Sequence, residues 1–252
     1  VQALGAAPRI RRLPDVLVNR IADWQFDAAN PRTANRAIPA GRLTRSSAIR
    51  VALGCAALCG VVCSGFWLAF GNPWPVLLAA PVLGWIALYS YTKRFTWLCH
   101  LFLGGALAAS PLAAAIAVEP AVLASSATIW LLAGMVALWV AGFDVIYALQ
   151  DVAFDRSAGL SSVPASLGVG RALWISRALH AGAFALLVAA WQTEPRLGLL
   201  FGLAVAGVGL LLIAEHVVLA KRGEKGLDMA FFTLNGVISC ILGAAGIADL
   251  LL

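Results

Sequence analysis

Charged side chains are scarce in this chain of 252 residues. Only 12% of its residues are Asp, Glu, Lys or Arg, whereas 62% are hydrophobic, and the mean hydropathy is +0.89. A composition this poor in charge is typical of a protein that lies in the lipid bilayer. Cysteine is also sparse, and the five cysteines imply no disulfide framework.

Long stretches without any charged residue divide the chain into expected membrane spans. A helix needs about 20 apolar residues to cross a bilayer. We therefore divide the charge-free run from 51 to 92 at Gly71-Asn72-Pro73, which is a turn sequence. The sequence predicts an all-α, polytopic transmembrane helical bundle of about eight helices, the first of them at 14–28. The other seven are expected at 49–70, 74–92, 95–118, 121–150, 171–191, 197–219 and 229–251.

Basic residues gather in alternate connections between these spans. The segments 31–50, 92–95, 151–177 and 219–228 carry 13 Lys and Arg residues, whereas the connections on the other side hold Arg196 alone. Cytoplasmic loops of membrane proteins are enriched in Lys and Arg, so we expect the first set to face the cytoplasm. The formal net charge of +6 then reflects membrane topology and not nucleic-acid binding.

Acidic residues are rarer still, at 12 in the whole chain, and five of them stand in two short motifs. The two motifs consist of Asn19, Asp23 and Asp27, and of Asp144, Tyr147, Asp151 and Asp155. Spacings of four, and of seven plus four, would place each set on one face of a helix. Ionisable groups at membrane depth are costly and mark functional sites. Two facing rows of carboxylates suit hard divalent cations that bridge a phosphate-bearing substrate.

The polar segments that follow the two motifs are similar to each other. Residues 30–42 and 155–166 both contain an Arg and, after it, a hydrophobic residue followed by Pro-Ala. We interpret this as an internal pseudo-repeat, with two half-sites that face each other across the bundle. Weak repeats also occur in transporters, so a membrane carrier with intramembrane acidic residues is an alternative to an enzyme.

A diphosphate substrate also needs fixed cations that take up charge as it leaves. Lys93 and Arg94 lie at the cytoplasmic end of an expected span, and Arg32 and Arg36 follow the first motif. Arginine is suited to bidentate phosphate contacts. The alternative interpretation is that all four anchor the chain at the membrane surface. The three histidines are expected to bond neighbouring helices and to take no part in chemistry: His100, His180 and His216.

Both motifs, in this order on a helical membrane chain, resemble those of the UbiA superfamily of intramembrane aromatic prenyltransferases. The 4-hydroxybenzoate polyprenyltransferase branch is the most similar. The most specific pieces are 19–27 with 30–42, 91–96, and 144–168. The resemblance implies one transmembrane prenyltransferase domain over 1–252, with a central cavity that opens sideways to lipid. Family members have nine spans, so we expect this chain to lack the family's first helix.

The resemblance also implies an activity. It is the Mg²⁺-dependent transfer of a polyprenyl group from polyprenyl diphosphate to the ring of an aromatic acid in quinone biosynthesis. 4-Hydroxybenzoate is the preferred acceptor, and a different aromatic acid of a menaquinone route is the alternative. The site would lie on the cytoplasmic side of a bacterial inner membrane, in contact with lipid.

Roles follow from the same resemblance by matching positions. The metal ligands would be Asp23, Asp27, Asp151 and Asp155. The substrate-binding residues would be Asn19, Arg32, Lys93, Arg94, Tyr147 and, for the carboxylate of the acceptor, Arg12. The residues expected to carry the chemistry are Asp23, Asp151 and Asp144, with Asp144 positioning or deprotonating the acceptor.

Overall fold

The computed structural model describes residues 14–223 and 233–252, and no β-strand occurs in these two ranges. The long helices are α3 (Arg45–Phe70), α4 (Trp74–Thr92), α5 (Cys99–Val118), α7 (Ala127–Tyr147), α10 (Val169–Thr193) and α11 (Leu199–Arg222). The shorter ones are α1 (Pro14–Ala22), α2 (Trp24–Ala29), α6 (Val122–Ser125), α8 (Val152–Ser157), α9 (Val163–Leu167) and α12 (Asn235–Leu251), with a 3-10 turn η1 (Ala148–Asp151).

Six helices in the described part of the chain are long and apolar enough to cross a membrane: α3, α4, α5, α7 with its extension to Ser157, α10 and α11. Helix α12 is apolar but shorter, with 17 residues. Large apolar side chains cover the outside of the bundle, and Leu68 is 84% exposed. Water would not favour such a surface, whereas lipid does. The protein is therefore an integral membrane protein, and the expected all-α bundle is confirmed.

The turn expected between the first two long helices lies where the sequence predicts it. Gly71 ends α3 in the left-handed conformation, with φ of 67°, which glycine adopts without steric cost. At the other end of α3, the side chain of Thr44 caps the helix by accepting a hydrogen bond from the Ser47 amide (3.2 Å). These two signals position α3 as one uninterrupted membrane helix.

The single helix expected over 14–28 is wrong, because α1 and α2 are separated at Asp23. The Ala22 carbonyl accepts a hydrogen bond from Nη2 of Arg94 (2.7 Å), which gives that carbonyl a partner outside the helix. The Asp23 amide still donates to the Asn19 carbonyl, and the Asp27 amide donates to that of Asp23. The three residues of the first motif therefore stay one turn apart, on helices of nine and six residues that are too short to cross a bilayer.

The expected spans 95–118 and 121–150 also have different bounds. Helix α5 begins only at Cys99, and α7 follows the short helix α6 and ends at Tyr147, directly before η1. The acids of the second motif therefore lie on three successive helical segments, Asp144 on α7, Asp151 on η1 and Asp155 on α8, and not on one regular α-helix.

Helix α7 is the central element, since it packs along both α5 and α10. Glycines permit these close approaches. A Cβ atom at Gly104 of α5 would lie 2.2 Å from the Ala137 carbonyl oxygen, and one at Gly142 of α7 would lie 2.3 Å from the His180 ring. Small residues let membrane helices approach in this way. The packing fixes the end of α7 that carries Asp144.

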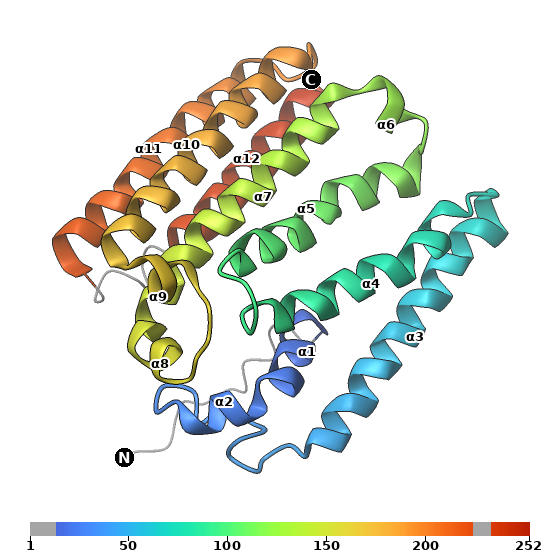
Figure 1. Ribbon diagram of the computed structural model, residues 1–252. Helices are drawn as coiled ribbons and strands as arrows, with labels where there is room; N and C mark the ends of the chain where they lie inside the picture. Colours follow the sequence, from blue (N-terminus) through green and yellow to red (C-terminus); the bar gives the residue numbers. More distant parts are fainter. Residues whose placement is uncertain (1–13, 224–232) are drawn as a thin grey trace, which may run out of the picture.

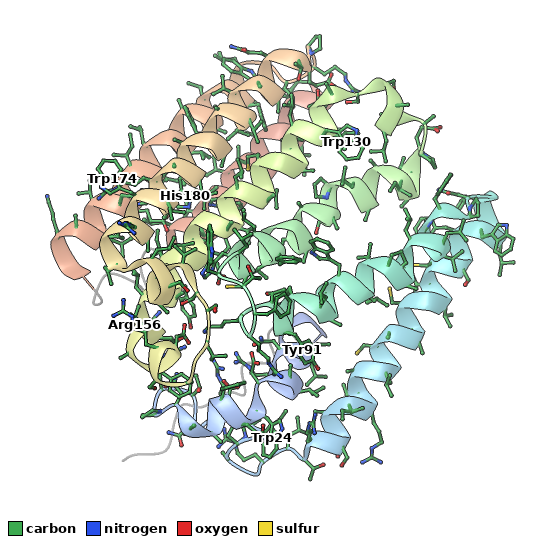
Figure 2. The ribbon with its side chains drawn as sticks, viewed as in Figure 1. Trp24, Tyr91, Trp130, Arg156, Trp174 and His180 are labelled. Carbon is green, nitrogen blue, oxygen red and sulfur yellow. The ribbon has the colours of Figure 1, made fainter. Side chains whose placement is uncertain are left out.

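Three short helices, α2, α8 and α9, gather at one end of the bundle. Figure 1 shows α2, α8 and α9 at this end, whereas α6 and the C-terminus lie at the opposite end. In Figure 2, Trp24 of α2 and Arg156 of α8 lie at the first end, and Trp130 of α7 lies towards the other. The end with the short helices carries both acidic motifs.

Candidate functional site

A cavity of about 970 Å³ opens at the end of the bundle where the short helices gather. The expected site residues that line it are Asn19, Asp23, Asp27, Arg32, Arg36, Lys93, Asp144, Tyr147, Asp151 and Asp155. Arg94 does not line the cavity but bonds Asp23, which does. Arg12 lies outside the described residues. The structure thus brings together, in one cavity, two motifs that are more than a hundred residues apart in sequence.

The first motif is held by amide and guanidinium groups. Asn19 Nδ2 donates to Asp23 Oδ2 (2.9 Å), and Arg94 Nη2 lies 3.2 Å from the other oxygen, Oδ1. Burial raises the pKa of Asp23 above its usual value, although Arg94 partly opposes the rise. Asp27 forms an ion pair with Arg36 and a longer one, of 3.5 Å, with Arg20.

Arg36 itself carries a lowered pKa. Burial is the main cause, and the positive charge of Arg20 adds to it, while the Asp27 carboxylate acts in the opposite direction. A guanidinium stays charged in proteins despite such a shift. Arg20 and Arg36 therefore place two positive charges around one carboxylate of the first motif.

Asp151 accepts hydrogen bonds from two residues of the loop that follows the first motif. Arg32 donates from Nε to Oδ1 (3.0 Å) and from Nη2 to Oδ2, and Asn30 Nδ2 donates to Oδ1 (2.9 Å). Arg32 also donates to the hydroxyl of Tyr147 (3.3 Å). Burial would lower the pKa of Arg32, but the Asp151 carboxylate raises it overall. These contacts join the two halves of the pseudo-repeat across the cavity.

Asp155 has a fully buried side chain, which is paired with a lysine. Lys93 Nζ lies 2.7 Å from Asp155 Oδ1, and the Ser162 hydroxyl donates to Oδ2 (2.9 Å). Burial would lower the pKa of Lys93, yet the Asp155 carboxylate raises it above its usual value. Ser162 also caps the N-terminus of α9, where its hydroxyl accepts from the Ala165 amide (3.4 Å). The residue that caps α9 thus also orients a motif carboxylate.

Asp144 differs from the other four carboxylates of the motifs. Its partner is His100, whose Nδ1 lies 2.7 Å from Asp144 Oδ2, and His100 Nε2 accepts from the Val163 amide (3.2 Å). His100 does bond a neighbouring helix, as expected, but it also lines the cavity, which the sequence reasoning missed. A signal was available, since no other His, Asp, Glu, Lys or Arg occurs from 95 to 118.

The donor set suits a magnesium ion that is shared with a substrate. The four carboxylates expected as metal ligands all line the cavity, and carboxylate oxygen is the ligand that Mg²⁺ prefers. Among residues 14–223 and 233–252, no three His, Cys, Asp or Glu side chains stand close enough to hold one metal ion by themselves. Mg²⁺ is usually bound by one or two carboxylates together with substrate phosphates and water, so two carboxylates per ion suffice.

The chain is similar to known proteins in sequence and in fold. The profile of the UbiA prenyltransferase family matches residues 16–237. A 4-hydroxybenzoate octaprenyltransferase of Chromohalobacter salexigens is 29% identical over 241 residues, which cover 95% of this chain and 76% of that protein. The solved structure of a UbiA homolog from Aeropyrum pernix K1 has a TM-score of 0.83 and 34% identity, covering 94% of this chain and 85% of that one.

A second solved structure supports the fold alone. It is that of a digeranylgeranylglyceryl phosphate synthase, with a TM-score of 0.67 and 18% identity over 94% of this chain and 81% of that one. The family profile covers most of the chain, and the solved structures reproduce its helical bundle. The chain therefore belongs to the UbiA prenyltransferase family, and it is a prenyltransferase and not a membrane carrier.

Proposed function

We propose that the protein transfers a polyprenyl group from polyprenyl diphosphate to the ring of an aromatic acid in quinone biosynthesis. 4-Hydroxybenzoate is the preferred acceptor, because the relative from Chromohalobacter salexigens, which matches nearly the whole chain, is named a 4-hydroxybenzoate octaprenyltransferase. The observation that carries the proposal is the convergence of both acidic motifs and four basic side chains on one cavity of an apolar bundle: Arg20, Arg32, Arg36 and Lys93.

The basic side chains supply the diphosphate end of the cavity. Each of these basic side chains forms an ion pair with a motif carboxylate. When the diphosphate binds, a phosphate oxygen would take the place of the carboxylate as the partner of the basic side chain. Arg32 is the strongest candidate, because its planar fork already binds a carboxylate through two nitrogens. Lys93 adds a point charge near the buried end of the second motif.

The charges of the site support a requirement for divalent cations. The ion pairs involve five basic side chains, and the two motifs contain five carboxylates, so their formal charges cancel (five minus five is zero) when His100 is neutral. A polyanionic diphosphate that enters this site needs added positive charge. Mg²⁺, held by Asp23, Asp27, Asp151 and Asp155, would neutralise the leaving diphosphate.

The rest of the cavity serves the carbon skeleton. Apolar side chains from four parts of the chain line it, namely Phe26, Leu103, Phe154 and Leu160. Departure of the diphosphate leaves an allylic cation, and apolar walls protect such a cation from water. The electron-rich ring of the acceptor attacks this cation, and Asp144 accepts the ring proton. The apolar tail needs no aqueous site, because it can extend into lipid.

The proposal includes a location. The loops that surround the cavity carry the excess of basic residues, among them Arg32, Arg36, Lys93 and Arg156. Such loops face the cytoplasm. We therefore place the protein in a bacterial inner membrane with the mouth of the cavity on the cytoplasmic side, where soluble aromatic acids and Mg²⁺ are available.

The test is diphosphate release by the purified protein in liposomes. One long-chain prenyl diphosphate is combined with a panel of aromatic acids, with Mg²⁺ or with EDTA. Release that requires both Mg²⁺ and 4-hydroxybenzoate supports the proposal. Diphosphate release that requires a different aromatic acid would instead support the alternative function in a menaquinone route. No release with any acceptor contradicts the proposed function.

A further inference from the structure

The five motif carboxylates fall into two electrostatic classes. Four of them pair with Arg or Lys: Asp23, Asp27, Asp151 and Asp155. Asp144 has no Arg or Lys partner within the described residues, and its side chain bonds only the imidazole of His100. The side chain of Asp144 is 24% exposed and lines the cavity, whereas that of His100 is 4% exposed.

The hydrogen bonds of His100 fix its tautomer. The Val163 amide can only donate, and it lies 3.2 Å from Nε2, so Nε2 is the ring nitrogen without a proton. Nδ1 therefore carries the proton and donates it to Asp144 Oδ2 over 2.7 Å. The imidazole that makes both bonds is the neutral form, and Oδ2 of Asp144 is the acceptor. The bond leaves Oδ1 of Asp144 without a partner among the described residues, available to the cavity.

We propose that His100 is a positioning residue that holds Asp144 as the base of the prenyl transfer. The inference rests on the proposed function and assigns a role to a residue outside both acidic motifs. In the reaction, a bond forms between the allylic carbon and a ring carbon of the acceptor, and the bond from the allylic carbon to the diphosphate oxygen breaks. The leaving diphosphate keeps that electron pair. The hydrogen on the attacked ring carbon then passes to Asp144 Oδ1 as a proton, and the ring regains its aromatic electrons.

A neutral partner suits a base better than a cation does. A guanidinium or ammonium group at hydrogen-bond distance stabilises the ionised carboxylate strongly and makes it a weaker proton acceptor. The imidazole N–H fixes the orientation of the carboxylate without a full positive charge. The four carboxylates that pair with Arg or Lys therefore suit the cation and diphosphate site, whereas Asp144, which pairs with a neutral imidazole, suits the role of proton acceptor.

His100 also ties the base to the diphosphate end of the cavity. Three consecutive residues, 161–163, bond three different elements around the site. The Ser161 amide donates to the Lys93 carbonyl (2.7 Å), the Ser162 hydroxyl donates to Asp155, and the Val163 amide donates to His100. The position of Asp144 relative to Lys93 and Asp155 is thus set through one short segment. Such positioning matters because small misplacements of reacting groups reduce rates strongly.

The experiment compares His100→Ala with His100→Gln in the full chain reconstituted in liposomes. Alanine removes both hydrogen bonds, whereas glutamine keeps one N–H donor for Asp144 and one carbonyl acceptor for the Val163 amide. We expect His100→Ala to lower kcat by about 100-fold, with the KM for the prenyl diphosphate within about twofold of wild type. His100→Gln should recover most of the lost kcat.

Two further variants isolate the route through Asp144. His216→Gln replaces another membrane histidine, which bonds His180 and does not line the cavity, and it should retain the kcat of the wild type. Adding His100→Ala to Asp144→Asn should cost nothing further in single-turnover rate, because the histidine acts through the aspartate.

The possible outcomes separate this inference from the proposed function. If the wild type releases no diphosphate with any acceptor, the proposed function fails. If the wild type is active and His100→Ala matches its kcat, the role of His100 alone is wrong. The role is also wrong if folded His100→Gln is as slow as His100→Ala, or if His100→Ala adds its full loss to Asp144→Asn. Should His100→Ala fail to fold, the recovery by His100→Gln decides.

Discussion

Lys93 Nζ lies 2.7 Å from Oδ1 of Asp155, a carboxylate whose side chain is completely buried. The two residues come from different halves of the chain, and the Ser162 hydroxyl completes the polar surroundings of Asp155. A buried carboxylate without a cation is strongly disfavoured. The pair therefore has a structural role in addition to its proposed contact with diphosphate.

The first prediction concerns this pair. Lys93→Met should lower the free energy of unfolding by about 3 kcal/mol, because it leaves a buried carboxylate without its cation. Lys93→Arg keeps the charge and should lose less stability. Thermal unfolding in detergent measures both variants. Equal stability of Lys93→Met and wild type would contradict the importance of the pair for the fold.

A second prediction concerns the fork of Arg32. Arg32→Lys preserves the charge but loses the bidentate hydrogen bonding from Nε and Nη2 to the Asp151 carboxylate. We expect the KM for the prenyl diphosphate to rise by about tenfold, the equivalent of one hydrogen bond to a charged group. Arg156→Lys is the matched control, since Arg156 bonds the Ala165 carbonyl (3.0 Å) and is not among the residues that line the cavity. If both variants keep the KM of the wild type, Arg32 does not bind the donor.

Helix packing gives a third prediction. Gly104→Ala would bring a Cβ atom to 2.2 Å from the backbone carbonyl oxygen of Ala137, so α5 and α7 would have to separate. We expect a loss of about 1–3 kcal/mol in the free energy of unfolding, as for other overpacked cores. Gly105→Ala, one residue away, meets only the Trp85 side chain at 3.4 Å and should change stability by less than about 0.5 kcal/mol. A more stable Gly104→Ala variant would mean that α5 and α7 lie further apart.

Metal removal should affect activity and not folding. Every carboxylate expected to bind Mg²⁺ already has a basic partner within the described residues. EDTA should therefore abolish prenyl transfer while it leaves the Tm of the substrate-free protein unchanged. A large fall in Tm on chelation would instead indicate a structural metal.

Local sequence signals were enough to predict much of the fold. Charge-free runs marked the long helices, and Gly71 marked the turn between α3 and α4. The spacing of the acids, and the expectation that both motifs end on the same side of the membrane, indicated that the motifs meet, and both do line one cavity. These predictions succeeded because the bilayer constrains the length and polarity of each helix.

The remaining features depend on contacts between distant residues. The break at Asp23 involves a hydrogen bond from Arg94, 72 positions after the Ala22 carbonyl that accepts it. The link between His100 and Asp144 spans 44 positions. No local pattern encodes such pairs, since they arise only when the helices pack. The same limit explains why Asn30, which bonds Asp151, was not singled out from the sequence.

The most direct measurement of the two half-sites compares Asp23→Ala and Asp151→Ala with wild type in liposomes that contain prenyl diphosphate, an aromatic acid and Mg²⁺. The two residues belong to different motifs and line the same cavity. Each substitution should abolish Mg²⁺-dependent transfer in a protein that remains folded by circular dichroism. Turnover at the rate of the wild type in either folded variant would contradict a diphosphate site shared by the two motifs.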